Sequence, residues 1–251
     1  QGPPHPHPFR HHAADRQIVT GMRKRMGCTL EDNIGRIRKA IQHAAIDNGR
    51  RADAVTLVAA SKTVESHRIQ KAIDLGLTVF GENRVQEAVS KWPELRSRNP
   101  GIELHLIGPL QSNKVRQAVD LFDVIESVDR SRLARAIAEE AERQGHAPAI
   151  YIQVNVGKEP QKGGVLPAEA SALIGECRDV YQLNVQGLMC IPPAGLDPSG
   201  HFAGLRSIAA DHGLHVLSMG MSADYPQAIA QGATHVRVGS ALFGARAPLQ
   251  P

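Results

Sequence analysis

The stretch VTLVAASKT, residues 55–63, runs through six β-branched, aliphatic or alanine residues and ends in a serine, a lysine and a threonine. A short apolar run of this kind predicts a strand that is buried on both faces. Lys62 stands at the carboxyl end of that strand. A surface lysine does not need a buried approach, so the position of Lys62 requires an explanation from the rest of the chain.

Seven further segments have strand patterns and alternate with helical ones. Strands are expected at 55–60, 78–80, 103–107, 124–128, 149–155, 185–189, 215–218 and 235–238, and helices at 66–75, 84–97, 113–120, 131–144, 167–178, 201–211 and 225–231, with a short helix after Ser240. Strands that are separated by helices pair in parallel through right-handed crossovers. Eight such units in about 220 residues predict a (β/α)8 TIM barrel. An open doubly wound sheet is the alternative, and it normally has fewer strands.

An additional N-terminal helix is expected before the barrel. Thr29 can cap a segment in which Leu30, Ile34, Ile37, Ile41 and Ala45 recur at helical spacing. Residues 1–28 are basic, rich in proline and histidine near their start, and lack this periodicity. We expect 1–28 to be a disordered leader and 29–251 to be a single barrel domain.

Charge and composition exclude several classes of function. The leader holds five basic residues and one acidic residue; of totals of 29 and 25, this leaves 24 of each sign in residues 29–251, so no nucleic-acid partner is inferred. No run approaches the roughly 20 apolar residues that a membrane span requires. Three cysteines without metal-ligand spacing, Cys28, Cys177 and Cys190, fit a reducing, cytoplasmic location.

The stretch VRVGSALFGAR, residues 236–246, has the features of an anion site. A strand ends, Gly239 permits close approach of the backbone, and Ser240 can begin a helix whose first N–H groups are free. Ser218 and Ser222 follow the neighbouring strand, and barrels often bind phosphate after strands seven and eight. The alternative is a tight turn with a serine as helix cap.

Arg237 alternates with Val236 and Val238 and should therefore point into the barrel mouth. A buried arginine needs a partner because its charge cannot be neutralised at ordinary pH. That partner is either a carboxylate in a structural ion pair or the ring nitrogen of a bound cofactor.

Lys62 agrees with the cofactor interpretation. Desolvation and a nearby cation lower the pKa of a lysine and make its neutral amine a nucleophile toward aldehydes. A Schiff-base lysine, a phosphate cradle and a ring-facing arginine together describe a pyridoxal 5′-phosphate (PLP) site. The alternative for Lys62 is an ion pair with Glu82, or contact with solvent.

Other polar side chains at strand ends are weaker candidates. Asn83 and Asn155 can bridge polar groups or form turns. Met189 can lie against a flat ring or fill the core. His105 is interpreted as a core histidine with its own hydrogen-bond partners, and Lys114 and Lys162 are expected in loops or helix starts in contact with solvent.

Seven stretches occur in order between residues 59 and 246 and carry a resemblance to a known family: AASKT, FGENRVQE, HLIGPLQSNK, IQVNVGKEPQKGG, GLMCIPP, LSMGMSADYPQAI and VRVGSALFGAR. Together they resemble the pyridoxal phosphate homeostasis proteins. QKGG stands where the family more often has KSG.

The resemblance implies a barrel like the amino-terminal domain of alanine racemase, with PLP joined to Lys62. It implies phosphate contacts from Ser218, Ser222, Gly239 and Ser240, a pyridine-nitrogen contact from Arg237, and places for Asn83, Asn155 and Met189 around the cofactor. It further implies a monomer, with PLP-dependent apoenzymes as candidate partners.

We therefore expect a PLP-binding protein of vitamin B6 homeostasis without substantial turnover. An arginine at the pyridine nitrogen weakens the ring as an electron sink, and the eight units leave no chain for a second domain. An amino-acid racemase-like enzyme is the alternative, and a proton donor opposite Lys62 would support it. A third hypothesis is a Schiff-base aldolase that works without PLP.

Overall fold

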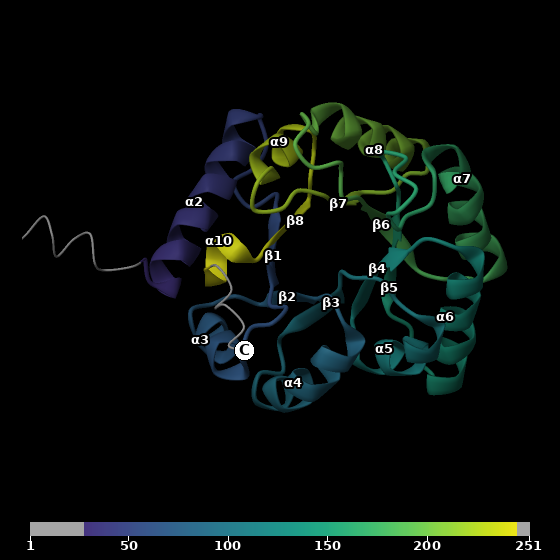
Figure 1. Cartoon of the computed structure of the whole chain (residues 1–251), viewed down its shortest axis with the longest axis horizontal. Coiled ribbons are helices and arrows are strands. Elements are labelled where there is room, and N and C mark those ends of the chain that lie inside the picture. Colours follow the sequence, from purple (N-terminus) through teal and green to yellow (C-terminus); the bar gives the residue numbers. More distant parts are fainter. Residues whose placement is uncertain (1–27, 245–251) are drawn as a thin grey trace, which may run out of the picture.

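Eight parallel strands close into a barrel in chain order in the computed structural model, which describes residues 28–244 (Figure 1). The strands are β1 (Thr56–Ala60), β2 (Val79–Glu82), β3 (Glu103–Leu106), β4 (Val124–Val128), β5 (Ala149–Gln153), β6 (Val185–Met189), β7 (Val216–Ser218) and β8 (His235–Val238). The predicted TIM barrel is confirmed.

Helices surround the barrel and follow the strands in turn (Figure 1). They are α2 (Leu30–Asp47), α3 (Ser66–Asp74), α4 (Val85–Arg98), the 3₁₀ turn η1 (Ser112–Lys114), α5 (Val115–Leu121), α6 (Ser131–Gln144), α7 (Pro167–Gly175), the π-helical turn η2 (Glu176–Val180), α8 (Ser199–Asp211), α9 (Tyr225–Ala230) and α10 (Ser240–Phe243). Most predicted bounds differ from the observed ones by no more than two residues, and two of the corrections concern α7 and β5. The helix expected over 167–178 changes to a π turn after Gly175, and the strand expected over 149–155 ends at Gln153.

The additional helix α2 is present where its periodicity predicts it. The Thr29 hydroxyl accepts from the Asp32 N–H and the Asp32 carboxylate accepts from the Thr29 N–H, which completes a capping box. The apolar face of α2 is buried at Ile34, Ile37 and Ile41. The leader proposed at 1–28 falls almost entirely outside the described residues.

Helix α2 also supports α10, the short helix after β8. Asn33 donates through Nδ2 to the Leu242 carbonyl at 2.9 Å, and Arg36 donates to the Ala241 carbonyl at 3.3 Å. Arg68 of α3 donates to the Phe243 carbonyl. Polar side chains thus satisfy the free carbonyls of α10, so that its amino-terminal end is held beside the barrel mouth.

Side chains divide between two regions because successive residues of a strand point to opposite faces. Outward-facing residues such as Leu104, Ile125 and Ile150 form one large apolar core with the helices. Inward-facing Val124, Tyr151 and Met189 form a smaller cluster within the barrel. Other inward-facing side chains are polar. Branched apolar side chains usually fill the interior of such a barrel, so these polar side chains require a separate explanation.

Candidate functional site

Lys62 lies two residues beyond the end of β1, at the carboxyl-terminal mouth of the barrel. Its side chain and that of Thr63 are exposed, whereas Ser61 and Val64 on either side of this pair are buried. The structure thus shows the contact with solvent that was one alternative for Lys62. The next residue, Thr63, has a φ of 62°, in the left-handed region that a β-branched residue rarely adopts.

Glu82 does not hold Lys62 as the simpler interpretation supposed. Its Oε1 atom lies 2.8 Å from Lys91 Nζ and accepts from Ser61 Oγ at 2.8 Å and from Trp92 Nε1 at 2.9 Å. These contacts, with Lys91 and Trp92 of α4, show that the Glu82 side chain points away from the barrel axis toward α4 and not into the mouth. The amine of Lys62 is left without an ion-pair partner among the described residues.

The neighbouring strand ends β7 and β8 bring small polar groups together. Gly239 follows β8 and Ser240 begins α10, so the first amides of α10 lie at the mouth without intrahelical acceptors. The Ala241 N–H lies 3.5 Å from Ser222 Oγ, a contact long enough to be exchanged for a better acceptor. A Cβ at Gly239 would lie 3.1 Å from the Ala60 carbonyl oxygen, so a side chain here would crowd β1. Ser222, Gly239 and Ser240 therefore form a compact cradle of donors.

Gly220 shapes the loop that carries Ser222. Its φ is 97°, and a Cβ there would lie 2.6 Å from the Ala228 Cβ. Neither the backbone conformation nor the space accepts another residue. The loop after β7 can therefore pass close to α9 and still present Ser222 to α10.

Arg237 points into the barrel, as its alternation with the two valines predicts. It is 3% exposed, and it donates from Nη1 to Ser218 Oγ at 2.8 Å and from Nη2 to the Cys190 carbonyl at 2.9 Å. No carboxylate lies within ion-pair distance of it among the described residues, so the simple ion-pair alternative is wrong. A guanidinium has five N–H donors, and these two bonds leave others for a ligand.

A hydrogen-bonded chain runs along the barrel interior beneath Arg237. Glu103 contacts His105 Nε2 at 2.6 Å, and Glu126 contacts His105 Nδ1 at 2.6 Å. Ser218 donates to the second oxygen of Glu126 and accepts from Arg237. We call this set Glu103, His105, Glu126, Ser218 and Arg237 the interior chain. It links the amino-terminal side of the barrel to the mouth.

The charges of the interior chain compensate one another. Burial alone would lower the pKa of His105, but its bonds to Glu103 and Glu126 outweigh burial and raise the pKa to about 9. Burial would raise the pKa of the Glu126 carboxyl, but His105 and the charge of Arg237 hold it below its usual value. The buried Glu126 carboxylate therefore lies between two buried cations, His105 and Arg237, and the half-exposed Glu103 supplies a second anion to His105. Such compensation is how charges tolerate burial.

The stability of the fold is expected to fall between pH 7 and pH 10. The pKa of His105 is about 9 in the folded chain, above the ordinary value of 6.5, so its contribution is complete below about 6.5 and is lost as the pH rises through 9. The contribution is on the order of 3 kcal/mol. Melting temperatures should be measured at pH 7 and pH 10. From the lower to the higher pH, the melting temperature of the unmodified chain should fall further than that of His105→Gln. The control His146→Gln, which alters an exposed histidine, should behave like the unmodified chain. Equal falls in all three proteins would contradict this role of His105.

Of the other predicted site residues, two lie at or inside the barrel mouth and the third is used within its own loop. Asn83 lies at the mouth, and its buried Oδ1 has no hydrogen-bond partner among the described residues. Met189 is buried inside the barrel. The Asn155 amide is used within its own loop, where it donates to the Glu159 carbonyl at 2.8 Å and accepts from the Glu159 N–H at 3.1 Å. Asn155 thus has the turn-forming role that was its alternative.

Two lysines near the mouth have partners of their own. Lys114 donates to Gln86 at 2.7 Å, and Lys162 pairs with Glu159 at 2.7 Å. His105 is a core histidine with hydrogen-bond partners, as expected. The sequence reasoning missed Glu126 and Lys91. A carboxylate in the middle of the short apolar run around 124–128 was the signal that could have directed attention to Glu126.

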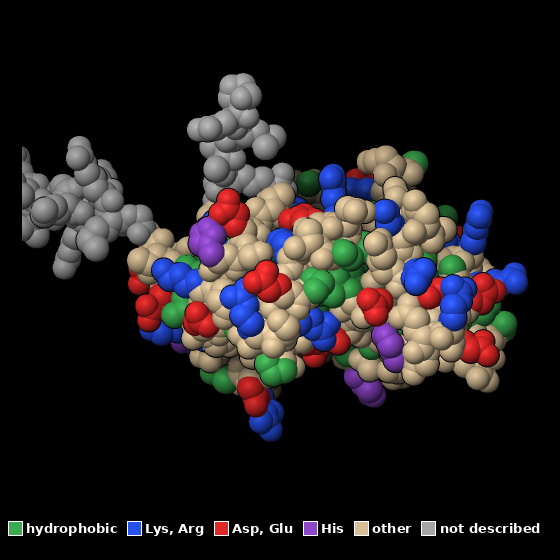
Figure 2. Space-filling view, turned by 90° about the horizontal axis from the view of Figure 1, so that it is seen from below, with side chains coloured by type: hydrophobic (Ala, Val, Ile, Leu, Met, Phe, Trp, Pro, Cys, Tyr) green, Lys and Arg blue, Asp and Glu red, His purple; other side chains and the backbone are tan. Residues whose placement is uncertain are grey.

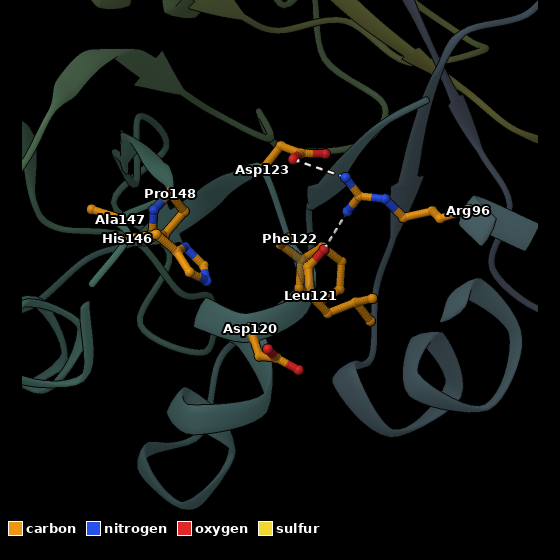
Figure 3. A pocket seen from close by; sticks show the side chains of 8 residues that line it. All are labelled: Arg96, Asp120, Leu121, Phe122, Asp123, His146, Ala147 and Pro148. Atoms are coloured by element: carbon orange, nitrogen blue, oxygen red, sulfur yellow. Dashed lines mark hydrogen bonds and ion pairs between the residues drawn. The ribbon is translucent and has the colours of Figure 1, made fainter. Parts of the chain in front are cut away.

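A separate hollow of about 340 Å³ lies at the opposite end of the barrel (Figure 3). Asp123 and Pro148, which line it, immediately precede β4 and β5. Its arginine, Arg96, is already bound to Asp123 and to the Leu121 carbonyl. This hollow is therefore distinct from the mouth and does not contain the candidate site.

Charged side chains of both signs are mixed on the face of the described residues that Figure 2 presents. This agrees with the neutral balance of residues 29–251. Among the described residues, no helix is both long and apolar enough to cross a membrane.

The barrel and its mouth define the class of protein. A family model described as the N-terminal domain of alanine racemase matches residues 38–247. The alanine racemase of Clostridium difficile shares the fold, with a TM-score of 0.63 at 14% identity over 82% of this chain and 56% of its own. The chain is thus a barrel of the alanine racemase N-terminal type.

Within that class, the chain belongs to the pyridoxal phosphate homeostasis protein family. It is 40% identical over 223 residues to the pyridoxal phosphate homeostasis protein of Pseudomonas aeruginosa, covering 87% of this chain and 96% of the relative. It is 39% identical over 226 residues to that of Escherichia coli K12, covering 86% and 97%.

Solved structures of one relative agree with this assignment. PipY of Synechococcus elongatus without PLP has a TM-score of 0.78 at 38% identity, covering 86% of this chain and 100% of PipY. PipY with PLP bound has a TM-score of 0.71 at 39% identity, covering 82% and 99%.

Proposed function

We propose that this chain binds PLP at the barrel mouth and serves PLP homeostasis. The observation that carries the proposal is that Lys62, Arg237 and the cradle of Ser222, Gly239 and Ser240 come from different strand ends of one barrel and face the same mouth. The related PipY, solved with PLP bound, supports the cofactor, and the named relatives support the physiological role.

The residues present fit each part of PLP. The cradle offers backbone and hydroxyl donors for a phosphate, and the spare N–H groups of Arg237 suit a pyridine nitrogen. Asn83, with its unpartnered buried oxygen, offers an acceptor, and Met189 lines the interior below. The Lys62 amine would condense with the aldehyde, forming a C=N bond and releasing the aldehyde oxygen as water. When bound, the cofactor supplies a reactive aldehyde and a conjugated ring.

Ser218 has a different place from the one the family resemblance implied. Its hydroxyl lies between Glu126 and Arg237, completely buried. We propose that Ser218 holds Arg237 in place and that Ser222, Gly239 and Ser240 make the phosphate contacts. Asn155 would act on the site through the loop that it closes.

The chain is proposed to hold and release PLP rather than to turn over amino acids. An arginine cannot lose its proton at ordinary pH, so Arg237 can only donate to the pyridine nitrogen and leaves that nitrogen unprotonated. An unprotonated ring is a poor electron sink, which disfavours racemisation. A cytoplasmic location, a monomeric state and PLP-dependent apoenzymes as recipients belong to the same proposal.

Titration with PLP tests the proposal directly. The purified chain should gain a visible absorption band at one equivalent, and borohydride should convert it to a stable adduct on a single peptide. Incubation with L- and D-amino acids should give no racemisation comparable to that of a racemase. A chain that gains no band with PLP would refute the cofactor assignment, and rapid racemisation would replace homeostasis with the enzyme alternative.

A further inference from the structure

Lys91 of α4 is a buried cation outside the candidate site. Its side chain is 11% exposed, and Nζ lies 2.8 Å from Glu82 Oε1 and 3.0 Å from Glu87 Oε1. Glu82 is fully buried, and its other oxygen has no hydrogen-bond donor among the described residues. The buried charge of Glu82 is therefore compensated mainly by Lys91. Lys91 also has backbone partners, and these give the cluster a structural consequence.

The consequence lies in the turn that carries Lys62. Lys91 Nζ also donates to the Ser61 carbonyl at 3.0 Å and to the Val64 carbonyl at 3.3 Å. These two carbonyls stand on either side of Lys62 and Thr63. Between them, the Thr63 N–H donates to Glu87 Oε1 at 2.6 Å. Three of the four residues of the turn are thus bonded to Lys91 or Glu87.

The turn needs such support because it is strained. Thr63 has a φ of 62°, a conformation that costs a β-branched residue free energy and persists only where surrounding contacts enforce it. Without these contacts, Thr63 would relax toward negative φ. Since Thr63 follows Lys62 directly, that relaxation would redirect the Lys62 side chain.

Glu82 is not itself a rival partner for Lys62. The β1–β2 register pairs Ala60 with Gly81, so Ser61 comes level with Glu82, and the Ser61 hydroxyl donates to the Glu82 carboxylate on the side of β2 that faces α4. Lys91 and Trp92 hold the same carboxylate there. The direction of the Lys62 side chain therefore depends on the backbone of the turn that Lys91 supports.

We propose that Lys91 is a positioning residue that holds the Ser61–Val64 turn, so that the Lys62 amine is directed to the place where it would form its imine. The inference deepens the proposed function and depends on it. It concerns the approach of Lys62 to the aldehyde and leaves the phosphate cradle and Arg237 unaffected.

The test compares covalent and non-covalent binding in Lys91→Met. Pyridoxine 5′-phosphate has an alcohol in place of the aldehyde and cannot form an imine, so its affinity reports on the cradle and Arg237 alone. We expect Lys91→Met to bind this analogue as the unmodified chain does. With PLP, its adduct should form about tenfold more slowly or worse. Lys91→Arg should restore most of the rate, and Lys71→Met, which alters an exposed lysine of α3, should change nothing.

Each outcome decides a different question. An unmodified chain that forms no adduct with PLP would refute the proposed function itself. If the unmodified chain forms the adduct and Lys91→Met forms it at the same rate, or loses the analogue as well while remaining folded, the positioning role is refuted. If Lys91→Met does not fold, the double variant Glu82→Gln Lys91→Met, which removes both buried charges, takes its place and should show the same slow adduct formation.

Discussion

Lys62→Ala is expected to abolish the borohydride-stable PLP adduct completely and to leave the melting temperature almost unchanged. The loss is complete because an imine requires a primary amine, and the neighbouring lysine Lys91 is held by Glu82 and Glu87. The fold is spared because the Lys62 side chain is exposed. Substitutions at exposed positions usually change stability by less than about 0.5 kcal/mol.

The measurement is mass spectrometry of the intact chain and of its peptides after borohydride reduction. Lys114→Ala is the matched control, because Lys114 also lies at the mouth but binds Gln86; it should keep a full adduct. Pyridoxine 5′-phosphate should still bind Lys62→Ala, since the cradle and Arg237 are intact. An adduct of unchanged yield in Lys62→Ala would place the cofactor on another lysine and overturn the assignment.

The sequence predicted the barrel and the residues of its mouth because both depend on local periodicity. The run VTLVAA predicts a strand, its end places Lys62 at one edge, and the alternation of Val236, Arg237 and Val238 turns the arginine inward. All of these follow from a repeat of two along a strand. The same rule found His105 in the core.

Contacts between distant strands could not be predicted in this way. Ser218 and Glu126 are 92 residues apart in sequence, and their hydrogen bond depends on how the barrel closes around them. Because this hydrogen bond could not be predicted, the sequence indicated only that Ser218 is a hydroxyl at a strand end. The pairing of Glu82 with Lys91 could not be predicted either, because it depends on which face of β2 meets α4. For this reason an ion pair between Lys62 and Glu82 remained an alternative at the level of the sequence.

Arg237→Gln is expected to produce the second large effect, a loss of roughly 3–5 kcal/mol of stability, which is typical when one partner of a buried charge network is removed. Glutamine can still donate to Ser218 or to the Cys190 carbonyl, but it carries no charge. The pKa of the Glu126 carboxyl should rise, since the charge of Arg237 is one of the causes that lower it. Thermal unfolding measures the loss, with Arg132→Gln, at an exposed position of α6, as a control that should change little.

A double-mutant cycle separates two causes of the stability loss in Arg237→Gln, which are the lost positive charge and the changed side-chain packing. If the loss arises because Glu126 keeps an uncompensated charge, Glu126→Gln Arg237→Gln should be more stable than Arg237→Gln alone, although two buried residues are altered. The cofactor gives an independent reading, because neither substitution touches Lys62 or the phosphate cradle. Both variants should still form the borohydride adduct, with weaker affinity and an absorption band shifted from that of the unmodified chain. A folded Arg237→Gln with an unchanged band and affinity would show that Arg237 makes no contact with the ring. In that case the whole interior chain, from Glu103 to Arg237, would serve the barrel core alone.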